Sequence, residues 1–216
     1  MNRTITIKGT GKVSVKPDLI IITMQLESHD YDYEKTMKLA AESVNILQNA
    51  IIKAGFNKED LKTTDFNIRT HYESYRDKDN NYKSRFDGYV CEQGLKLEFD
   101  FNTSVLSNVL TSIGKATVEP NLNIQFSVKD KDAINEELLI RATENARRKA
   151  EVLARASNVT LGDLISIDYN WGDLYLYSRT SYMMENNCLA FKTSAPDIEP
   201  DDIEVSDTVT FVWEIK

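Results

Sequence analysis

The chain has 216 residues, of which 41% are hydrophobic and 28% are charged, and its formal net charge at pH 7 is −8. This length and composition predict a globular protein with a buried core, and the acidic balance argues against a general nucleic-acid binder, because phosphate binding needs a cationic surface. No run approaches about 18 uninterrupted apolar residues, so we expect no transmembrane segment.

The N-terminal residues predict two short strands joined by a glycine turn. Residues 3–8 and 12–15 alternate in a pattern rich in β-branched side chains, and Gly9–Gly11 separates them. Strand-like sequence therefore starts close to Met1, without the apolar run that a signal peptide requires. On this basis we expect a cytoplasmic protein.

The glycines and the lysine of Gly9–Lys12 resemble part of a phosphate-binding P-loop. The complete motif would need a glycine at Thr6 and a hydroxyl side chain at Val13, and neither is present. The segment is therefore interpreted as a turn between strands.

A long amphipathic helix follows the next strand. Residues 19–28 begin apolar and then alternate, as expected of a strand that enters the middle of a sheet. Residues 33–54 place apolar side chains at helical spacing, and Gly55 stands where a glycine often follows a helix. The apolar face carries Met37, Ala40, Ala41, Val44, Leu47, Ile51 and Ala54.

The middle of the chain predicts a long hairpin. Residues 63–75 and 86–101 have strand character, and the charged, turn-rich segment 76–85 forms the tip between them. Gly88 and Gly94 mark the expected irregular positions of the second strand.

A short helix is expected after this hairpin. Thr103 or Ser104 would cap its first turn, and Gly114 would end it. Its apolar side carries Val105, Leu106, Val109, Leu110 and Ile113. Residues 121–128 then alternate as a strand.

Residues 133–156 form the most regular pattern in the chain and predict a helix of about six turns. Small and apolar side chains recur on one face at Ile134, Leu138, Ala142, Ala146, Ala150, Leu153 and Ala154. Because alanine dominates this face, a partner can pack closely against it, while the opposite face can form i, i+4 ion pairs. Arg147 and Arg148 are interpreted as part of a solvated face, with a partner or phosphate surface as the alternative.

The C-terminal third predicts further strands. Residues 164–171 and 203–215 alternate, residues 174–191 could form a strand followed by a loop, and residues 193–202 form a polar link. The order of elements hints at two βαβ-like halves that share one sheet. Since no Pro-, Gly- or Ser-rich linker is present, we predict one α+β domain over residues 1–216.

Asp77, Asp79 and Asn81 occupy the first three oxygen-ligand positions of an EF-hand loop. The turn glycine of that motif is replaced by Tyr82, and its bidentate glutamate is replaced by Gly88. A solvated hairpin tip is therefore favoured over a calcium site.

His29 and His71 are the only histidines, and each is expected near a strand end. A pair could bind a metal ion or transfer protons, but no spacing brings them together, and surface or edge positions explain them equally well. Cys91 and Cys188 lack C-x-x-C spacing and are interpreted as reduced structural thiols. We therefore predict no catalytic, metal-binding or cofactor-binding residue, no cofactor and no enzymatic activity.

Aromatic residues gather near the C-terminus. They could line a groove or a subunit interface, where aromatic rings contribute large contact area, or they could pack on a sheet face. These residues are Tyr169, Trp171, Tyr175, Tyr177 and Tyr182. An interface here would make the chain a self-assembling protein. The alternative is a ligand- or protein-binding module with an aromatic groove near residues 169–191.

Two sets of residues, spread over about residues 5–215, keep the order and spacing of one protein family. The first set is Gly9, Gly11, Val13, Val15, Pro17, Asp18, Gly55, Thr64, Phe66, Ile68, Gly88, Tyr89 and Leu95. The second set is Gly114, Phe126, Ala142, Ala146–Ala150, Leu153, Ala154, Leu161, Gly162, Ile198, Pro200, Ile203, Val205 and Val209. Together they resemble the SIMPL domain, although no single motif among them is specific.

The resemblance implies an α+β fold whose twisted, mainly antiparallel sheet packs against two long helices and one short helix. It also implies mostly periplasmic or outer-membrane-associated bacterial relatives, some linked to oxidative-stress tolerance or known as immunogens. It further implies self-assembly into rings or channel-like oligomers, and it brings no established catalytic residues.

The sequence departs from the family pattern in three places. We expect no leader of the kind that most bacterial relatives have, although a chain trimmed of its leader would begin in the same way. Asp201 replaces a glycine, and Glu92–Gly94 replaces an asparagine-bearing run. We predict a non-enzymatic homo-oligomer without a nucleic-acid partner. Sheet edges, helix faces or the aromatic region of residues 169–191 would make its subunit contacts, and Arg147 and Arg148 are further candidates for the interface.

Overall fold

The computed structural model describes residues 3–170, 172, 174–184 and 198–216. The chain forms two compact units: the first comprises residues 1–18, 127–179 and 200–216, and the second comprises residues 19–126 and 180–199. The expectation of one domain stays a prediction, because compactness alone does not show which parts fold independently.

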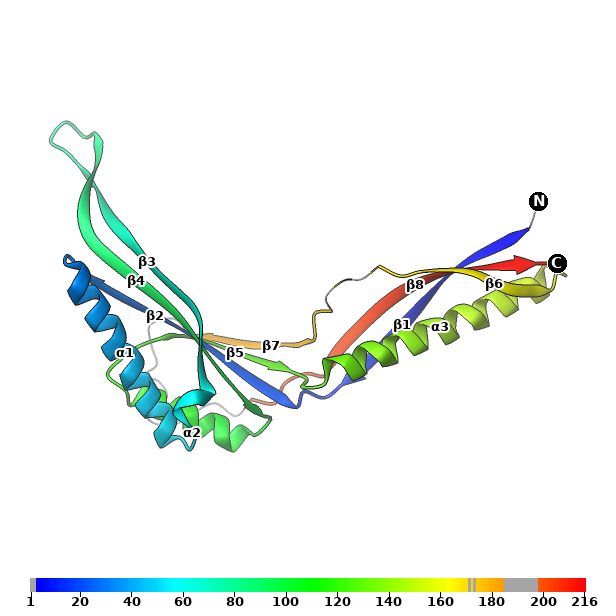
Figure 1. Ribbon diagram of the computed structural model, residues 1–216, viewed down its shortest axis with the longest axis horizontal. Helices are drawn as coiled ribbons and strands as arrows, with labels where there is room; N and C mark the ends of the chain where they lie inside the picture. The colour runs from blue at the N-terminus through cyan, green and yellow to red at the C-terminus, as the bar shows by residue number, and fades with distance from the viewer. Residues whose placement is uncertain (1–2, 171, 173, 185–197) are drawn as a thin grey trace. The chain divides into compact units, whose positions relative to one another are not determined.

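The first unit is a three-stranded antiparallel sheet packed against one long helix. The strand order is β1-β8-β6, with β1 at Thr4–Val15, β8 at Ile203–Ile215 and β6 at Leu161–Asp168. Helix α3, Lys131–Ala156, runs alongside β1 and β8 (Figure 1). It begins where the Asp130 carboxylate accepts a hydrogen bond from the Ala133 amide, as an N-cap should.

The core of the first unit joins the small-residue face of α3 to alternate residues of two strands. Its buried members are Ile7, Ala142, Ala146, Ala150, Val209, Phe211 and Trp213. The predicted glycine turn at Gly9–Gly11 is wrong, because β1 is one continuous strand. A Cβ atom on Gly9 would clash with the Ala142 carbonyl oxygen and lie 2.7 Å from the Ala146 Cβ. The glycines therefore mark the close approach of a helix.

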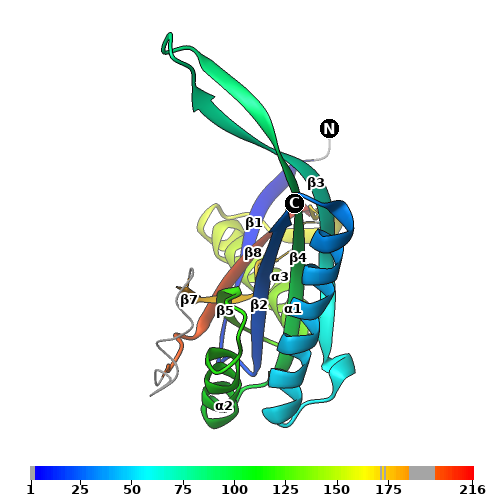
Figure 2. The same cartoon turned by 90° about the vertical axis from the view of Figure 1, so that its left-hand side faces the viewer.

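The second sheet has the strand order β3-β4-β2-β5-β7. The strands are β2 at Leu19–Asp30, β3 at Leu61–Arg76, β4 at Tyr82–Asp100, β5 at Asn121–Ser127 and β7 at Tyr177–Met184. Helices α1, Tyr33–Lys53, and α2, Thr103–Gly114, accompany the sheet, and α1 lies along β2 and β4 (Figure 2). A short 3-10 helix, η1, occupies Lys58–Asp60.

The core of the second unit buries one face of β2 and leaves the side chains of the other face outside this core. Ile20, Ile22, Met24 and Leu26 of β2 pack with Leu47 and Ile51 of α1, Leu95 and Leu97 of β4, and Leu106 and Leu110 of α2. Because side chains alternate along a strand, His29 points to the opposite, more polar face.

The predicted α+β class with two long helices and one short helix is confirmed. The strands form two sheets, however, so the expectation of two halves sharing one sheet is wrong. Gly55 follows α1 with a positive φ of 103°, as expected. The N-cap of α2 is Asn102 and not Thr103 or Ser104, because the Asn102 side chain accepts from two amides of the first turn.

Part of the predicted C-terminal region is described. Strand β7 confirms a strand within residues 174–191. The predicted loop beyond Met184 and most of the polar link 193–202 lie outside the described residues. Among the helices of the described ranges, none is both long enough and apolar enough to cross a bilayer.

Asp77 organises the tip of the β3–β4 hairpin. Its carboxylate accepts hydrogen bonds from the amides of Asp79, at 2.9 Å, and Asn81, at 3.0 Å, and Lys83 Nζ lies 2.9 Å from Oδ2. Asn80 takes the left-handed turn position with φ of 63°. Asp77, Asp79 and Asn81, which match the first ligand positions of an EF-hand loop, thus form a turn held together by hydrogen bonds to the Asp77 carboxylate.

Acidification is expected to loosen this tip. Lys83 and then the Asn81 amide lower the pKa of Asp77 below its ordinary 3.8, so the carboxylate stabilises the tip above that value. This stabilisation is lost as the pH falls through the lowered pKa. Amide shifts of Asp79 and Asn81 in a pH titration should report the change, and Asp77→Asn should abolish it. A midpoint above 3.8 would contradict this assignment.

Candidate functional site

One edge of the first sheet is closed by side chains of α3. Three polar residues, spaced by four along the helix, bind backbone groups of alternate residues on β1. The spacings agree because four helical residues rise about 6 Å and two strand residues rise about 6.6 Å. The bonds join Arg141 Nη1 to Lys12 O (2.8 Å), Thr10 N to Asn145 Oδ1 (3.1 Å) and Lys149 Nζ to Lys8 O (2.9 Å). These backbone groups of β1 are therefore not available to another strand.

The other edge of the same sheet carries exposed apolar side chains. In the part of the chain that the structure describes, β6 is an edge strand, and Leu164, Ile165 and Ile167 are 46%, 52% and 57% exposed. The pairing of β6 with β8 shifts register between Leu164 and Ser166, so Ile165 is an extra residue in this strand. An exposed apolar edge of this kind is a template for pairing with another strand.

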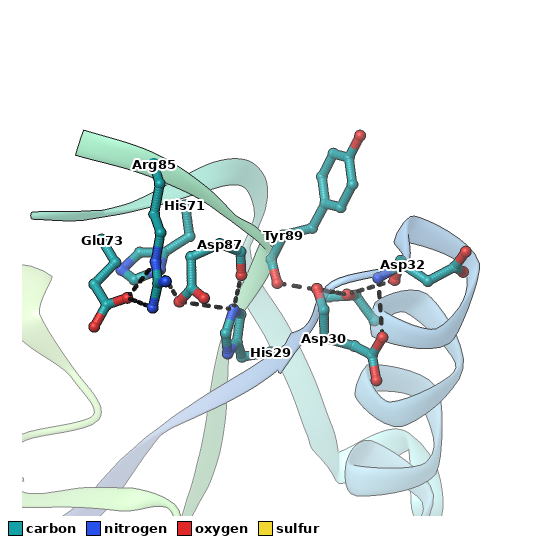
Figure 3. Close-up of polar contacts among 9 residues, drawn as sticks. His29, Asp30, Asp32, His71, Glu73, Arg85, Asp87 and Tyr89 are labelled. Atoms are coloured by element: carbon teal, nitrogen blue, oxygen red, sulfur yellow. Dashed lines mark hydrogen bonds and ion pairs between the residues drawn. The ribbon is translucent and has the colours of Figure 1, made fainter. Parts of the chain in front are cut away.

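A second feature lies on the polar face of the other sheet, where three strands bring His29, His71 and Asp87 together (Figure 3). His29 is on β2, His71 on β3 and Asp87 on β4, which runs between them. His71 Nδ1 lies 3.1 Å from Asp87 Oδ2, and His29 Nε2 lies 3.7 Å from the same oxygen and 2.6 Å from the Asp87 carbonyl oxygen. The two imidazole rings meet edge to face, with centroids 5.4 Å apart.

A β-bulge turns Asp87 toward the two histidines. His71 pairs with Gly88 and Tyr72 pairs with Phe86, which leaves Asp87 as the extra residue on β4. Such an insertion shifts the alternation of side chains and re-aims one of them. Gly88 has φ of 104°, and a Cβ atom there would lie 2.7 Å from Tyr31 Cα, so the bulge requires glycine.

The surroundings of the cluster are polar and half-exposed. The side chains of His29, His71 and Asp87 are 41%, 38% and 37% exposed. Beside them Arg85 Nε donates to Glu73 Oε2 at 2.9 Å, and this carboxylate, with a smaller contribution from Asp87, raises the pKa of the guanidinium. Glu73 thus balances the charge of Arg85, and Asp87 supplies the negative charge that faces the imidazoles.

A comparison with known families matches almost the whole chain. Residues 5–213 match SIMPL, described as a protein of unknown function (DUF541). The chain belongs to the SIMPL family. The resemblance drawn from the sequence is thereby confirmed, and the match includes β6 as well as His29, His71 and Asp87.

Three bacterial relatives of this SIMPL chain carry names. It is 26% identical over 163 residues to the 26 kDa periplasmic immunogenic protein of Brucella melitensis, and 25% identical to that of Brucella abortus. It is 22% identical over 162 residues to the uncharacterized protein YggE of Edwardsiella ictaluri. The matches cover 76%, 76% and 75% of this chain, and the chain spans 65% of the length of the two Brucella proteins.

Two of the aromatic residues predicted at an interface of this SIMPL chain lie together. Tyr175 is 71% exposed, and its ring centroid is 4.9 Å from that of Tyr177, over which Lys131 Nζ is placed at 5.3 Å. The hollow beside them is lined by other residues: Lys131, Asp132, Asn135, Gly172, Leu174 and Leu176. An aromatic groove receives no support from this hollow, and the interface role of the tyrosines stays a prediction.

The other predicted aromatic residues are used differently. Tyr169 packs against the core of the first unit, where burial and then the hydrogen-bonded Asp207 raise the pKa of its hydroxyl. Tyr182 packs against the core of the second unit. Trp171 lies outside the described residues.

Arg147 and Arg148 are both exposed on α3. Arg147 Nε donates to Glu151 Oε1 at 3.1 Å, one of the i, i+4 pairs expected from the sequence. Their part in an interface stays a prediction.

Of the predicted structural residues, Cys91 is a buried free thiol whose pKa is raised by burial and then by Glu92. Cys188 lies outside the described residues. Sequence spacing does not bring His29 and His71 together, but the strand register does. His29 lies near the end of β2 as expected, whereas His71 lies inside β3.

Proposed function

We propose that this SIMPL-family protein is a non-enzymatic, self-assembling protein whose subunits pair through strand β6. The observation that supports this proposal is the difference between the two edges of its first sheet. Side chains of α3 bind the backbone of β1, whereas β6 leaves Leu164, Ile165 and Ile167 exposed. A protein that protects one edge and exposes apolar residues on the other has an edge suited to pairing.

A second copy of the chain is the proposed occupant of this edge. Two identical edge strands can pair about a two-fold axis, which gives a closed and self-complementary contact. The pairing would satisfy backbone groups of β6 and bury the exposed parts of its apolar side chains. A fully buried isoleucine contributes about 1.5–3 kcal/mol, so a side chain that is already half-buried would add about half of that.

The names of the relatives support a location for this assembly. Both Brucella proteins are named periplasmic, and we extend that location to this chain in place of the cytoplasmic one expected from its sequence. An envelope role is therefore part of the proposal.

An Ile165→Lys variant is expected to weaken self-association at least tenfold. Lysine would place a charge at the centre of the paired edge, where burial without a partner is unfavourable. Size exclusion with light scattering over a range of micromolar concentrations would measure the change. Ile52→Lys, at a residue of α1 that is 46% exposed, is the matched control and should leave the assembly unchanged.

Two outcomes would count against this function. A wild-type chain that stays monomeric at high micromolar concentration would contradict self-assembly. An Ile165→Lys variant that assembles as the wild type does would contradict β6 as the contact.

A further inference from the structure

We infer that His29, His71 and Asp87 bind a divalent first-row transition-metal ion of the Zn²⁺ class. Each residue comes from a different one of three adjacent strands, and their donor atoms all lie within 4.8 Å of one another (Figure 3). This site goes beyond self-assembly through β6 and is independent of it, because its ligands belong to the second unit.

The donor set decides the kind of ion. Two imidazole nitrogens and one carboxylate oxygen suit Zn²⁺ and its neighbours in the first transition row. Mg²⁺ and Ca²⁺ prefer shells made of oxygen, so two of the three donors here are unsuitable for them. With three protein ligands on a half-exposed face, water would complete the coordination shell.

The distances suit a small ion after a modest adjustment. Metal–ligand bonds of about 2.0–2.2 Å place two ligands of a tetrahedral ion about 3.4 Å apart. The carboxylate oxygen Asp87 Oδ2 already lies 3.1 Å from His71 Nδ1 and 3.7 Å from His29 Nε2. The two ring nitrogens lie within 4.8 Å of each other. They must therefore approach by at most about 1.4 Å, and half-exposed rings can rotate by that amount.

Metal binding would replace two hydrogen bonds. Carbonyl and carboxylate oxygens only accept hydrogen bonds. In the metal-free arrangement His29 Nε2 therefore donates a hydrogen bond to the Asp87 carbonyl oxygen, and His71 Nδ1 donates one to Asp87 Oδ2. A coordinating nitrogen must offer its lone pair, so each proton would pass to the other nitrogen of its ring. The two states therefore differ in tautomer at both histidines, and this difference is directly observable.

The strand bulge fits a binding role better than a packing role. Without the extra residue, Asp87 would point to the opposite face of β4 from His29 and His71. The bulge instead aims a carboxylate at two imidazoles. An ion held here would join the end of β2 to both strands of the β3–β4 hairpin, at the point where the pairing of β2 with β4 ends.

Nitrogen-15 imidazole spectra of tag-free, chelator-treated protein test the site directly, since the chain contains only two histidines. Titration with Zn²⁺ should give saturable binding at one equivalent. Both rings should change together, with the bound nitrogens His29 Nε2 and His71 Nδ1 losing their protons. Mg²⁺ and Ca²⁺ at the same concentrations should leave both spectra unchanged.

Calorimetric titration of variants gives a second readout. Asp87→Asn and His71→Gln should each weaken Zn²⁺ binding at least tenfold, with thermal melts to verify folding. Glu98→Gln removes an exposed carboxylate that pairs with Lys96 on the same strand, and it should bind as the wild type does.

The wild-type spectra alone can overturn the inference. A change at only one ring would indicate an ordinary surface histidine. Binding that is absent below about 1 mM Zn²⁺, or that leaves both ring protons in place, would show that the cluster is held by hydrogen bonds only.

Discussion

A Gly9→Val variant is expected to lose about 4 kcal/mol of the free energy of unfolding of the first unit. Its Cβ atom alone would clash with the Ala142 carbonyl oxygen and press on the Ala146 Cβ at 2.7 Å. The Ala142 carbonyl oxygen belongs to the helix backbone, so it cannot rotate away as a side chain can. The helix would have to move off the sheet, and it would then separate Ala142, Ala146 and Ala150 from Phe211.

The fluorescence of Trp213 can measure this loss. Trp213 is buried in the first core and stacks on Phe211 with ring centroids 5.3 Å apart, so its emission should shift when the helix leaves. A Trp171→Phe background leaves Trp213 as the only tryptophan. Urea denaturation in this background gives the free energy of unfolding.

Thr10→Val is the matched control, because it introduces the same side chain one residue along the same strand. Side chains alternate, so the side chain of Thr10 lies on the face away from α3. We expect a change of less than about 1 kcal/mol at this position. Equal stability of the two valine variants would show that the close approach of helix and strand is not needed.

Much of the fold is predictable because its signals are local. The alanine repeat of α3 and the apolar spacing of α1 each lie within one segment, where a period of 3.6 is sufficient to define a face. Leu153 shows the limit of that reasoning. The sequence pattern places Leu153 on the packed face, but its side chain is 47% exposed. The buried residues of α3 recur every four positions and include Ala150 and Ala154, so Leu153 lies beside the packed face.

The glycines of β1 show why other features escape prediction. A Gly-x-Gly segment fits a turn and a close helix contact equally well, and the helix that decides lies more than a hundred residues later. The protection of the β1 edge depends on the same pairing. Arg141, Asn145 and Lys149 are ordinary polar positions of a helix until the strand beside them is known.

The histidine cluster depends on register and on a bulge, and neither can be derived from spacing. The sequence does mark Gly88 as an irregular position, and that irregularity is the one that turns Asp87. Which residues the turned carboxylate meets is decided by the pairing of β4 with both β2 and β3. One residue of slip in either pairing would place the histidines on the wrong face.

Truncation of Leu47 to alanine is expected to lower the free energy of unfolding of the second unit by about 3–5 kcal/mol. Leu47 is fully buried in the core that joins α1 to Ile22, Met24 and Leu97. Alanine is an excellent helix former, so the loss would come from packing and not from helix propensity. Leu39→Ala on the same helix is the control, since Leu39 is 41% exposed and should lose less than about 1 kcal/mol.

The same variant tests whether the chain is one folding domain. Far-UV circular dichroism follows the helices of both units, whereas Trp213 in the Trp171→Phe background follows only the first unit. If the chain unfolds as one domain over residues 1–216, Leu47→Ala should shift both transitions equally. If the Trp213 transition stays where it is in the wild type, the two compact units unfold separately, and the single-domain prediction is wrong.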